Sequence, residues 1–381
     1  MVSIIDGGGV RGVFVVRILS ALEKTFQRLH GKQTRIADHV DVIAGTSTGG
    51  LIAAMLASPD KNGRPMFQAK GIEEFYSQNC AKIFPQSNSR FIRLLRYIRA
   101  IFKGPIYSGK NLRQMINNTI PNLRLNETIT NLVIPTFDMK DNKAIIFSTY
   151  KARKDTLMNP HLKDICIGTA AAPIYLPPHG FTINDTESGK SAEFNLIDGG
   201  LVANNPTFLA MTEAIDEYRM QNPEDTNLES LRFVVLSSGT GEVSNEPYDA
   251  KTAEKWGMLR WIKPLIDALF KGNEEAQKKL KNLIWDKVTD SLRIQPRNLS
   301  RDLASLDDSS MKNLEGLVSV ADRHLQQVVN KDDIKGLDLN DVQSNDGITY
   351  QMALEKFAKI SYEESKKRIA SKSNEGNGYC E

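Results

Sequence analysis

The amino-acid sequence predicts an α/β fold with a mainly parallel central sheet and helices on both of its faces. One pattern carries this prediction, and it occurs twice near the start of the chain: an apolar strand, a glycine-containing turn and a helix. The first copy covers residues 2–29 and the second begins at residue 40. Strands that alternate with helices usually pair in parallel, and ligands bind such sheets at the carboxyl ends of their strands.

The first copy begins with the apolar strand at residues 2–5. The turn that follows reads Asp6-Gly7-Gly8-Gly9-Val10-Arg11-Gly12. The helix after it is expected to reach about Leu29, because large apolar residues recur there at spacings of three and four. Gly31 is a natural stop for this helix.

The second copy places a serine where the chain turns from strand to helix. An apolar run at 40–44 predicts a buried strand, and the run at 51–57 predicts a buried helix. Between them lies Gly45-Thr46-Ser47-Thr48-Gly49, the nucleophile-elbow pattern G-x-S-x-G. A glycine-rich turn with an idle serine would have the same sequence, so this stretch alone leaves both interpretations open.

The rest of the chain is expected to complete one extended domain. A short helix that ends at Pro173 is predicted, and Asn205 and Pro206 predict the start of a helix that reaches about Met220. Residues 250–330 are expected to be helix-rich. Further strands are predicted at 132–137, 144–148, 194–197 and 231–236, and the domain is assigned to residues 1–362, followed by a flexible tail at 363–381.

Composition excludes several classes of protein. The chain has 381 residues, of which 40% are hydrophobic and 25% charged, and its net charge of +3 predicts no nucleic-acid partner. Its three cysteines, Cys80, Cys166 and Cys380, have no disulfide or metal-site spacing, so a reducing compartment is permitted. No metal is expected, because none of the usual ligand clusters is present.

The sequence also carries an expectation about location. No apolar run is long enough to span a bilayer, and an apolar strand follows Met1 directly. A cytoplasmic protein with peripheral membrane association is expected, or a vacuolar or secreted one if a targeting peptide precedes this chain.

The glycine turn after the first strand has two functional interpretations. Gly7-x-Gly9-x-x-Gly12 matches the dinucleotide-binding fingerprint, which would predict an oxidoreductase. That fingerprint requires an acidic residue at the end of the second strand, where this chain has Ile43-Ala44-Gly45. In the alternative, successive glycine amides form an oxyanion hole and Arg11 adds a cation nearby.

No histidine is placed as the base of a Ser-His-Asp triad. His324 follows the acidic candidates but lies in a polar stretch typical of a solvated surface, and His179 precedes Asp198 in the chain. Asp198 follows an apolar strand and precedes two glycines, so it is a candidate base for Ser47. An ordinary Asp-Gly turn is the competing explanation.

Taken together, the motifs at 6–12, 45–49 and 198–200 resemble the patatin-like phospholipase family of plant lipid acyl hydrolases. The resemblance covers about residues 2–360 and includes supporting stretches at 107–110, 134–138, 168–173, 203–206 and 238–241. One departure is Asp198-Gly199-Gly200, where relatives often have Asp-Gly-Ala.

The resemblance implies a three-layer α/β/α fold and a Ser-Asp dyad of Ser47 and Asp198. It further implies an oxyanion hole of Gly7, Gly8 and Gly9 supported by Arg11, with no calcium or other cofactor. The expected activity is release of fatty acids from phospholipids and galactolipids through an acyl-enzyme. A storage or defence protein with incidental esterase activity is the alternative, and oligomeric state stays open.

Two stretches are candidates for contact with membrane lipid. Residues 90–103 place Arg93, Arg96, Arg99 and Lys103 on one helical face and large apolar groups on the other. Residues 256–263 contain two tryptophans and basic groups. Packing of either apolar face on the protein core is the competing explanation.

Overall fold

The fold is seen in a computed structural model. It describes residues 1–86, 103–241, 249–257, 282–297, 299–300, 302–339 and 347–376, together with positions 260, 261, 264, 265, 268, 272, 275, 276, 279 and 280. The stretch 90–103 lies, except for Lys103, outside these described residues. None of the described helices is both long enough and apolar enough to cross a membrane.

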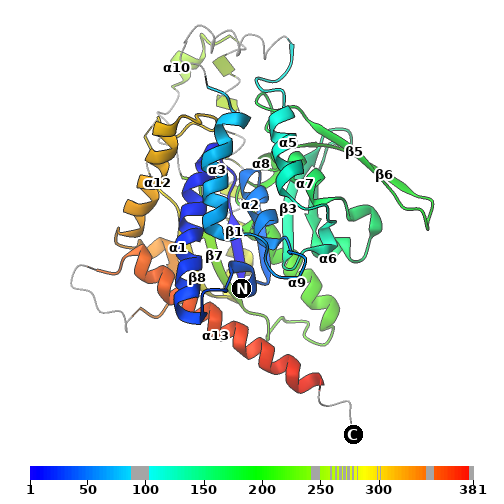
Figure 1. The fold of residues 1–381 in the computed structure, drawn as a ribbon, viewed down its shortest axis with the longest axis vertical. Coiled ribbons are helices and arrows are strands. Elements are labelled where there is room, and N and C mark those ends of the chain that lie inside the picture. Colours follow the sequence, from blue (N-terminus) through cyan, green and yellow to red (C-terminus); the bar gives the residue numbers. More distant parts are fainter. Residues whose placement is uncertain are drawn as a thin grey trace.

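A single twisted sheet forms the middle of the molecule (Figure 1). Its order is β5-β6-β3-β2-β1-β7-β8-β9, with β4 paired to β3. The central strands β3, β2, β1, β7 and β8 are parallel to one another, and β4, β6 and β9 join them antiparallel. The strands are β1 (Val2–Ile5), β2 (Val42–Gly45), β3 (Asn131–Asp138), β4 (Lys143–Ser148), β5 (His179–Asn184), β6 (Ser191–Ile197), β7 (Phe233–Ser238), β8 (Val288–Ile294) and β9 (Ile334–Lys335).

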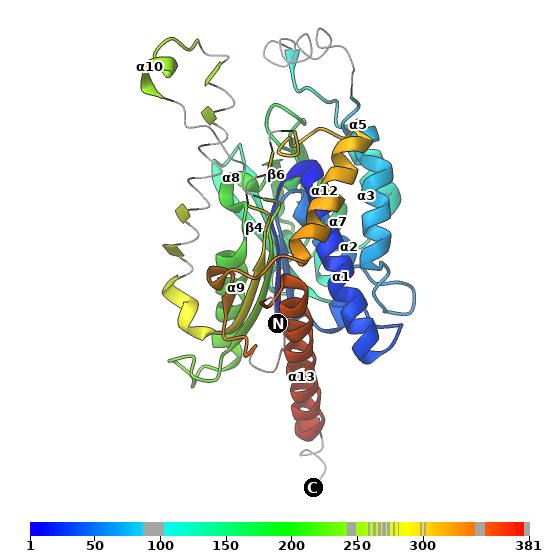
Figure 2. The same cartoon turned by 90° about the vertical axis from the view of Figure 1, so that its left-hand side faces the viewer.

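Helices cover both faces of this sheet, which gives three layers (Figure 2). One face packs against a large apolar cluster, and the other against a smaller cluster that includes Met211 and Ile215. On the first face lie α1 (Gly12–His30), α2 (Thr48–Ala57), α3 (Ala69–Ile83), α5 (Lys110–Thr119), α7 (Leu162–Thr169), α12 (Met311–Leu325) and α13 (Tyr350–Gly376); on the second lies α9 (Thr207–Gln221). The short helices are α6 (Thr149–Ala152), α8 (Gly200–Ala203) and α10 (Ala250–Ala253).

Alternation along the strands explains the two clusters. On β1, Val2 and Ile4 belong to the smaller cluster and Ile5 to the larger one, as side chains on a strand point alternately to opposite faces. On β2, Val42 and Ala44 face the smaller cluster while Ile43 faces the larger. The predicted three-layer α/β/α fold is confirmed.

Several predicted elements differ from the structure. No helix covers 170–173; these residues follow α7, which ends at Thr169. The predicted helical region 250–330 contains β8, whose inner positions Leu292 and Ile294 are fully buried. The edge strand β5 was not predicted, although its side chains alternate between exposed and partly or fully buried positions along the strand.

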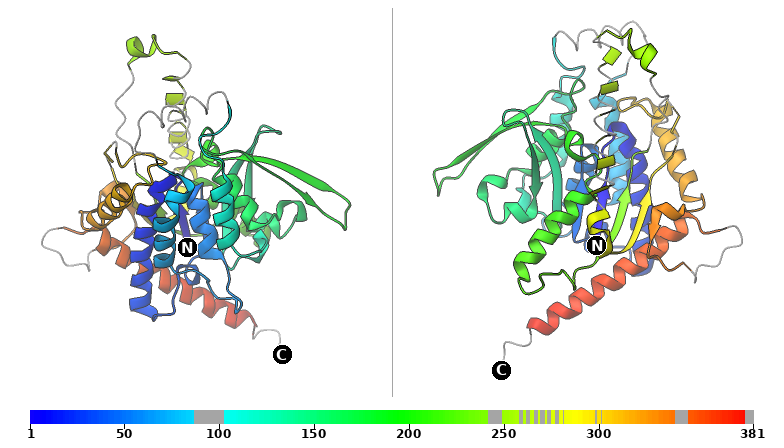
Figure 3. Two further views of the ribbon diagram at one scale, coloured as in Figure 1. Left: turned by 45° about the horizontal axis from the view of Figure 1, so that its top comes forward. Right: turned by 180° about the vertical axis from the view of Figure 1, so that it is seen from behind.

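The C-terminal helix α13 runs without a break across the boundary expected at residue 362 (Figure 3). Ser361 and Ser365 are both almost fully buried, so one face of this helix stays packed beyond that boundary. The hairpin of β5 and β6 projects away from the body of the molecule, and in both panels its tip lies on the same side as the C-terminal end of α13.

Candidate active site

Ser47 lies in the turn between β2 and α2 with a backbone conformation that residues other than glycine rarely adopt. Its φ is 54° and its ψ is −122°. Both flanking glycines are required by close backbone packing: a Cβ on Gly45 would lie 2.2 Å from the carbonyl oxygen of Gly49, and a Cβ on Gly49 would lie 2.2 Å from that of Ile5. The turn therefore has the tight strand-to-helix geometry that the G-x-S-x-G pattern predicts.

A threonine holds this turn in place. The Ser47 amide donates to Thr169 Oγ1 at 3.0 Å, and Thr169 Oγ1 donates to the Pro135 carbonyl of β3 at 2.8 Å. Thr169 is the last residue of α7 and is fully buried. The strained serine is thus tied through one hydroxyl to the central sheet.

Asp198 lies directly beside Ser47. Ser47 Oγ donates a hydrogen bond of 2.7 Å to Asp198 Oδ2, and the Gly200 amide donates one of 2.7 Å to Asp198 Oδ1. The Asp198 amide donates to the Ala171 carbonyl at 3.1 Å, which fixes the backbone as well. Both carboxylate oxygens are therefore oriented, one toward the serine and the other toward the first turn of α8.

Burial changes the acidity of this carboxyl group. Asp198 is only 3% exposed. Desolvation raises the pKa of Asp198 to about 6, against the smaller opposing effects of the hydrogen bonds from Gly200 and Ser47. A carboxylate with a pKa near neutrality is a better proton acceptor than an exposed aspartate, yet it is still ionised at pH 7.

The glycine turn, residues 7–11, lies next to the serine. A Cβ on Gly7 would come within 3.4 Å of Ser47 Cβ and 2.5 Å of Asn204 Oδ1. The Gly7 amide donates to the Asn204 carbonyl at 3.1 Å, so this amide is already occupied. By contrast, the Gly8 and Gly9 amides donate no hydrogen bond to any residue in the described part of the chain.

Neighbouring segments hold the glycine turn. Thr240 Oγ1 donates to the Gly7 carbonyl at 2.5 Å, and the Val10 amide donates to the Leu306 carbonyl at 2.9 Å. Gly9 has a φ of 58°, and a Cβ there would lie 2.1 Å from the Leu306 carbonyl oxygen. This position therefore needs glycine both for its backbone conformation and for space.

Arg11 braces the same turn. It is 8% exposed, and its guanidinium donates to the Gly8 carbonyl at 3.3 Å and to the Gly241 carbonyl at 3.1 Å. Both acceptors are backbone carbonyls, one in the glycine turn and one in the segment that follows β7. The Arg11 guanidinium therefore stabilises the turn conformation in which the Gly8 and Gly9 amides are available.

The two histidines considered as candidate bases, His324 and His179, make their contacts outside the Ser47–Asp198 pair. His324, expected on the solvated surface, is instead 6% exposed and stacks on Tyr350 with ring centroids 4.3 Å apart; that expectation was wrong because one face of α12 is buried. Burial lowers the pKa of His324. His179 lies in β5, and its Nε2 hydrogen bonds to Asp164 at 2.8 Å. Within the described residues, no histidine hydrogen bonds to Ser47 or Asp198.

Sequence reasoning missed the residues that support the site. Thr169, Asn204, Thr240 and Leu306 all bond to the elbow or the glycine turn. The first three lie in the supporting stretches 168–173, 203–206 and 238–241, which were the only signal in the sequence. Leu306 acts through its backbone carbonyl, so its side chain could give no signal.

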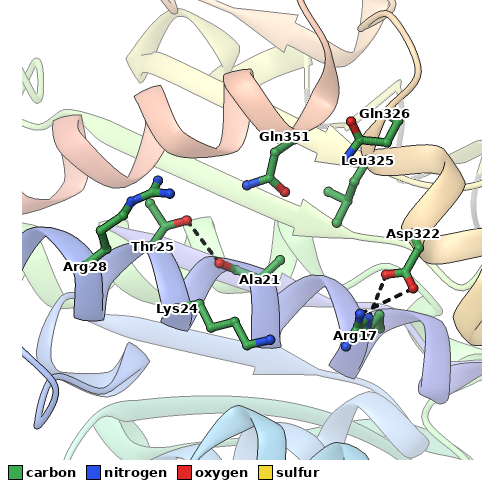
Figure 4. A pocket seen from close by; sticks show the side chains of 9 residues that line it. All are labelled: Arg17, Ala21, Lys24, Thr25, Arg28, Asp322, Leu325, Gln326 and Gln351. Atoms are coloured by element: carbon green, nitrogen blue, oxygen red, sulfur yellow. Dashed lines mark hydrogen bonds and ion pairs between the residues drawn. The ribbon is translucent and has the colours of Figure 1, made fainter.

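Two other features contribute no catalytic group. A groove of about 430 Å³ between α1, α12 and α13 contains neither Ser47 nor Asp198 (Figure 4). Two of its cations are paired, Arg17 with Asp322 at 2.7 Å and Arg28 with Glu355 at 2.9 Å. In the tryptophan stretch, the rings of Trp256 and Trp261 lie edge to face, 5.3 Å apart, and Trp261 is 40% exposed.

Comparison with known proteins places the chain in a family. The model of the patatin-like phospholipase family matches residues 4–211, which include both Ser47 and Asp198. The chain belongs to the patatin-like phospholipase family.

Plant relatives that the chain covers over most of their length support this assignment. Patatin-like protein 1 of Arabidopsis thaliana is 40% identical over 96% of this chain and 90% of its own length. Patatin-like protein 1 of Oryza sativa subsp. indica is 40% identical over 86% of this chain and 81% of its own. Patatin-15 of Solanum tuberosum is 34% identical over 96% and 90%. Membership of this phospholipase family supports lipid acyl hydrolysis as the class of activity.

Proposed function

We propose that this patatin-like protein hydrolyses acyl esters of phospholipids and galactolipids with Ser47 as nucleophile and Asp198 as its base. The hydrogen bond of 2.7 Å between Ser47 Oγ and the buried Asp198 carboxylate is the observation that carries this proposal. This hydrogen bond gives the Ser47 hydroxyl a proton acceptor with a suitable pKa, which serine requires in order to attack an ester.

The first half of the reaction forms an acyl-enzyme. Asp198 accepts the hydroxyl proton as Ser47 Oγ attacks the ester carbonyl carbon. The oxyanion that forms accepts hydrogen bonds from the Gly8 and Gly9 amides. These two N–H groups donate to no other residue within the described structure. Collapse of this intermediate breaks the ester bond, and the departing alcohol takes the proton from Asp198.

The second half releases the fatty acid. A water molecule attacks the acyl carbonyl while Asp198 accepts its proton, and the same amides again receive the oxyanion. Collapse expels Ser47 Oγ, which recovers the proton, and frees the acid. Each oxyanion-hole donor of this kind contributes about 3 kcal/mol of transition-state stabilisation.

The assignment of Gly7 differs from that of its two neighbours. Its amide is bonded to Asn204, so we assign Gly7 to the close packing of the turn against Ser47 and the donor role to Gly8 and Gly9. Arg11 stabilises the turn through its hydrogen bonds to the Gly8 and Gly241 carbonyls.

This mechanism uses backbone amides where some phospholipases use a metal ion, so we expect activity without calcium. Release of fatty acid from phosphatidylcholine and monogalactosyldiacylglycerol vesicles should be equal in calcium and in excess chelator. Membrane contact through residues 90–103 stays a proposal from the sequence alone.

A fluorophosphonate probe with mass-spectrometric mapping tests the chemistry directly. We expect labelling at Ser47, lost in Ser47→Ala and strongly slowed in Asp198→Asn, with both variants folded by circular dichroism. Ser77→Ala, which removes a helix-surface hydroxyl, and Asp164→Asn, which faces His179, are matched controls that should label normally. Full hydrolysis by Ser47→Ala and Asp198→Asn would refute the proposal and favour a storage or defence protein with incidental activity.

A further inference from the structure

Tyr107 lies between the two parts of the candidate site, the loop behind Asp198 and the glycine turn. This proposal rests on the function proposed above. We propose that Tyr107 and Asp307 are positioning residues that hold the Gly8 and Gly9 amides in place relative to Ser47 and Asp198. Among the contacts of the described residues, neither Tyr107 nor Asp307 hydrogen bonds to Ser47 or Asp198.

The backbone of Tyr107 is joined to the loop that follows α7. The Tyr107 amide donates to the Tyr175 carbonyl at 2.9 Å, and the Ile106 amide donates to the Ile174 carbonyl at 2.8 Å. The same loop provides the Ala171 carbonyl that accepts the Asp198 amide at 3.1 Å. Tyr107 is therefore fixed to the segment that orients the base.

Strain in this loop indicates that its position matters. Ile174 has a φ of 72°, a genuine outlier for a β-branched side chain. Such strain persists only where the surroundings impose the conformation, and it gathers near active sites. The two hydrogen bonds to residues 106 and 107 are part of what imposes it.

The side chain of Tyr107 reaches in the other direction. Its hydroxyl donates to Asp307 Oδ2 at 2.8 Å, and Ser305 Oγ donates to Asp307 Oδ1 at 3.0 Å. Asp307 directly follows Leu306, whose carbonyl accepts the Val10 amide and lies against Gly9. The carboxylate therefore controls where the Leu306 carbonyl meets the glycine turn.

These contacts form one continuous connection from Asp198, through the loop at 171–175, Tyr107 and Asp307, to the glycine turn. Tyr107 is only 8% exposed, so its bond to the carboxylate is little weakened by competing water. Other contacts keep the segment folded without it: Ser309 Oγ donates to the Phe84 carbonyl at 2.6 Å, and Ser310 caps α12. Loss of the tyrosine hydroxyl should therefore misplace the amides without unfolding the segment.

Tyr107→Phe tests the proposal, because it removes the hydroxyl alone. Tyr218→Phe is a matched control, since Tyr218 makes the same kind of bond, 2.8 Å to Asp225 Oδ2, at the end of α9. We expect Tyr107→Phe to lower kcat and the rate of fluorophosphonate reaction about tenfold with KM unchanged, because the oxyanion donors are displaced by a fraction of an ångström. Its Tm should match that of Tyr218→Phe.

A double-mutant cycle tests whether Tyr107 acts through Asp307. Asp307→Ala should lower kcat at least as much as Tyr107→Phe does, because it also removes the bond from Ser305. Adding Tyr107→Phe to Asp307→Ala should have no further effect, because the tyrosine hydroxyl has already lost its acceptor. Asp307→Asn keeps an acceptor for the tyrosine hydroxyl and should retain most of the activity.

Three outcomes would overturn the proposal. Normal kcat in Tyr107→Phe would show that the connection is not needed, and a fall in Tm with kcat and KM changing together would show a purely structural role. Additive effects in the double variant would separate the two residues. Failure of the underlying function is distinguishable, because the wild-type protein would then not be labelled at Ser47.

Discussion

Ser47 Oγ donates a hydrogen bond of 2.7 Å to Asp198 Oδ2 across a separation of 151 residues in the chain. The serine comes from a turn in the parallel core, and the aspartate follows β6, which joins that core antiparallel. β6 pairs with β3 at Ile197 opposite Phe137 and at Leu196 opposite Asp138, and Asp198 follows directly where β6 ends. The bond places a buried base beside the proposed nucleophile without a histidine.

The pH dependence of hydrolysis should report the acidity of Asp198. Its pKa is raised to about 6 by burial, and only the ionised form can accept the serine proton. We expect kcat/KM to fall as pH decreases through about 6 and to be level between pH 7 and pH 8. A profile measured with a soluble ester of constant charge checks this, and a midpoint near 4 would contradict the proposed role of burial.

The same carboxyl group should lower the stability of the fold at neutral pH. Its pKa is higher in the folded chain than in the unfolded chain, so the folded state binds the proton more readily between about pH 4 and pH 6, and stability falls as pH rises through that window. Asp198→Asn removes the buried charge and keeps the Gly200 contact. We expect it to raise the free energy of unfolding at pH 7, by up to about 3 kcal/mol.

Chemical denaturation at two pH values checks this expectation. The gain in Asp198→Asn should be present at pH 7 and small at pH 4, where the wild-type carboxyl group is protonated. Asp164→Asn, which changes a less buried aspartate beside His179, is the control and should give no such gain. Equal stability of wild type and Asp198→Asn at pH 7 would argue against a desolvated carboxylate.

Thr169→Val should damage the elbow while leaving the dyad residues in the chain. The change preserves shape but leaves the Ser47 amide and the Pro135 carbonyl without their partner, and each buried group left unpaired costs about 1–3 kcal/mol. We expect lower Tm and lower kcat. Thr212→Val, which removes a hydroxyl bonded to the Phe208 and Leu209 carbonyls of its own helix, is the comparison and should keep kcat.

Gly9→Ala should abolish activity. The new Cβ would lie 2.1 Å from the Leu306 carbonyl, and the φ of 58° disfavours any side chain, so the turn must move. Gly71→Ala, in α3, where the new Cβ would meet no described atom within 4 Å outside its chain neighbours and the adjacent helix backbone, should leave activity intact. Comparison of fluorophosphonate labelling in the two variants gives the answer; normal labelling of Gly9→Ala would contradict the assigned donor role of this turn.

Prediction of the strands succeeded where periodicity and burial coincide. The strands predicted at 132–137 and 231–236 correspond to β3 and β7, whose residues are almost all buried. β8 was missed because it lies within a polar stretch, and its partners on β7 decide its conformation. His324 was misjudged because a polar helix can still bury one of its faces. The packing of α12 on α1 and α13 shows which face of the helix that is.

The strand-turn-helix repeats, the family, and the candidates Ser47 and Asp198 could all be read from the sequence, because glycine turns and apolar runs are local properties of a chain. The geometry and acidity of the site became visible once the fold was known. The fold brought the aspartate to 2.7 Å from the serine, buried it so that its pKa rises, and occupied the Gly7 amide while leaving those of Gly8 and Gly9 available within the described residues. Those properties depend on contacts between distant segments, since desolvation and hydrogen bonding are set by neighbours that folding supplies.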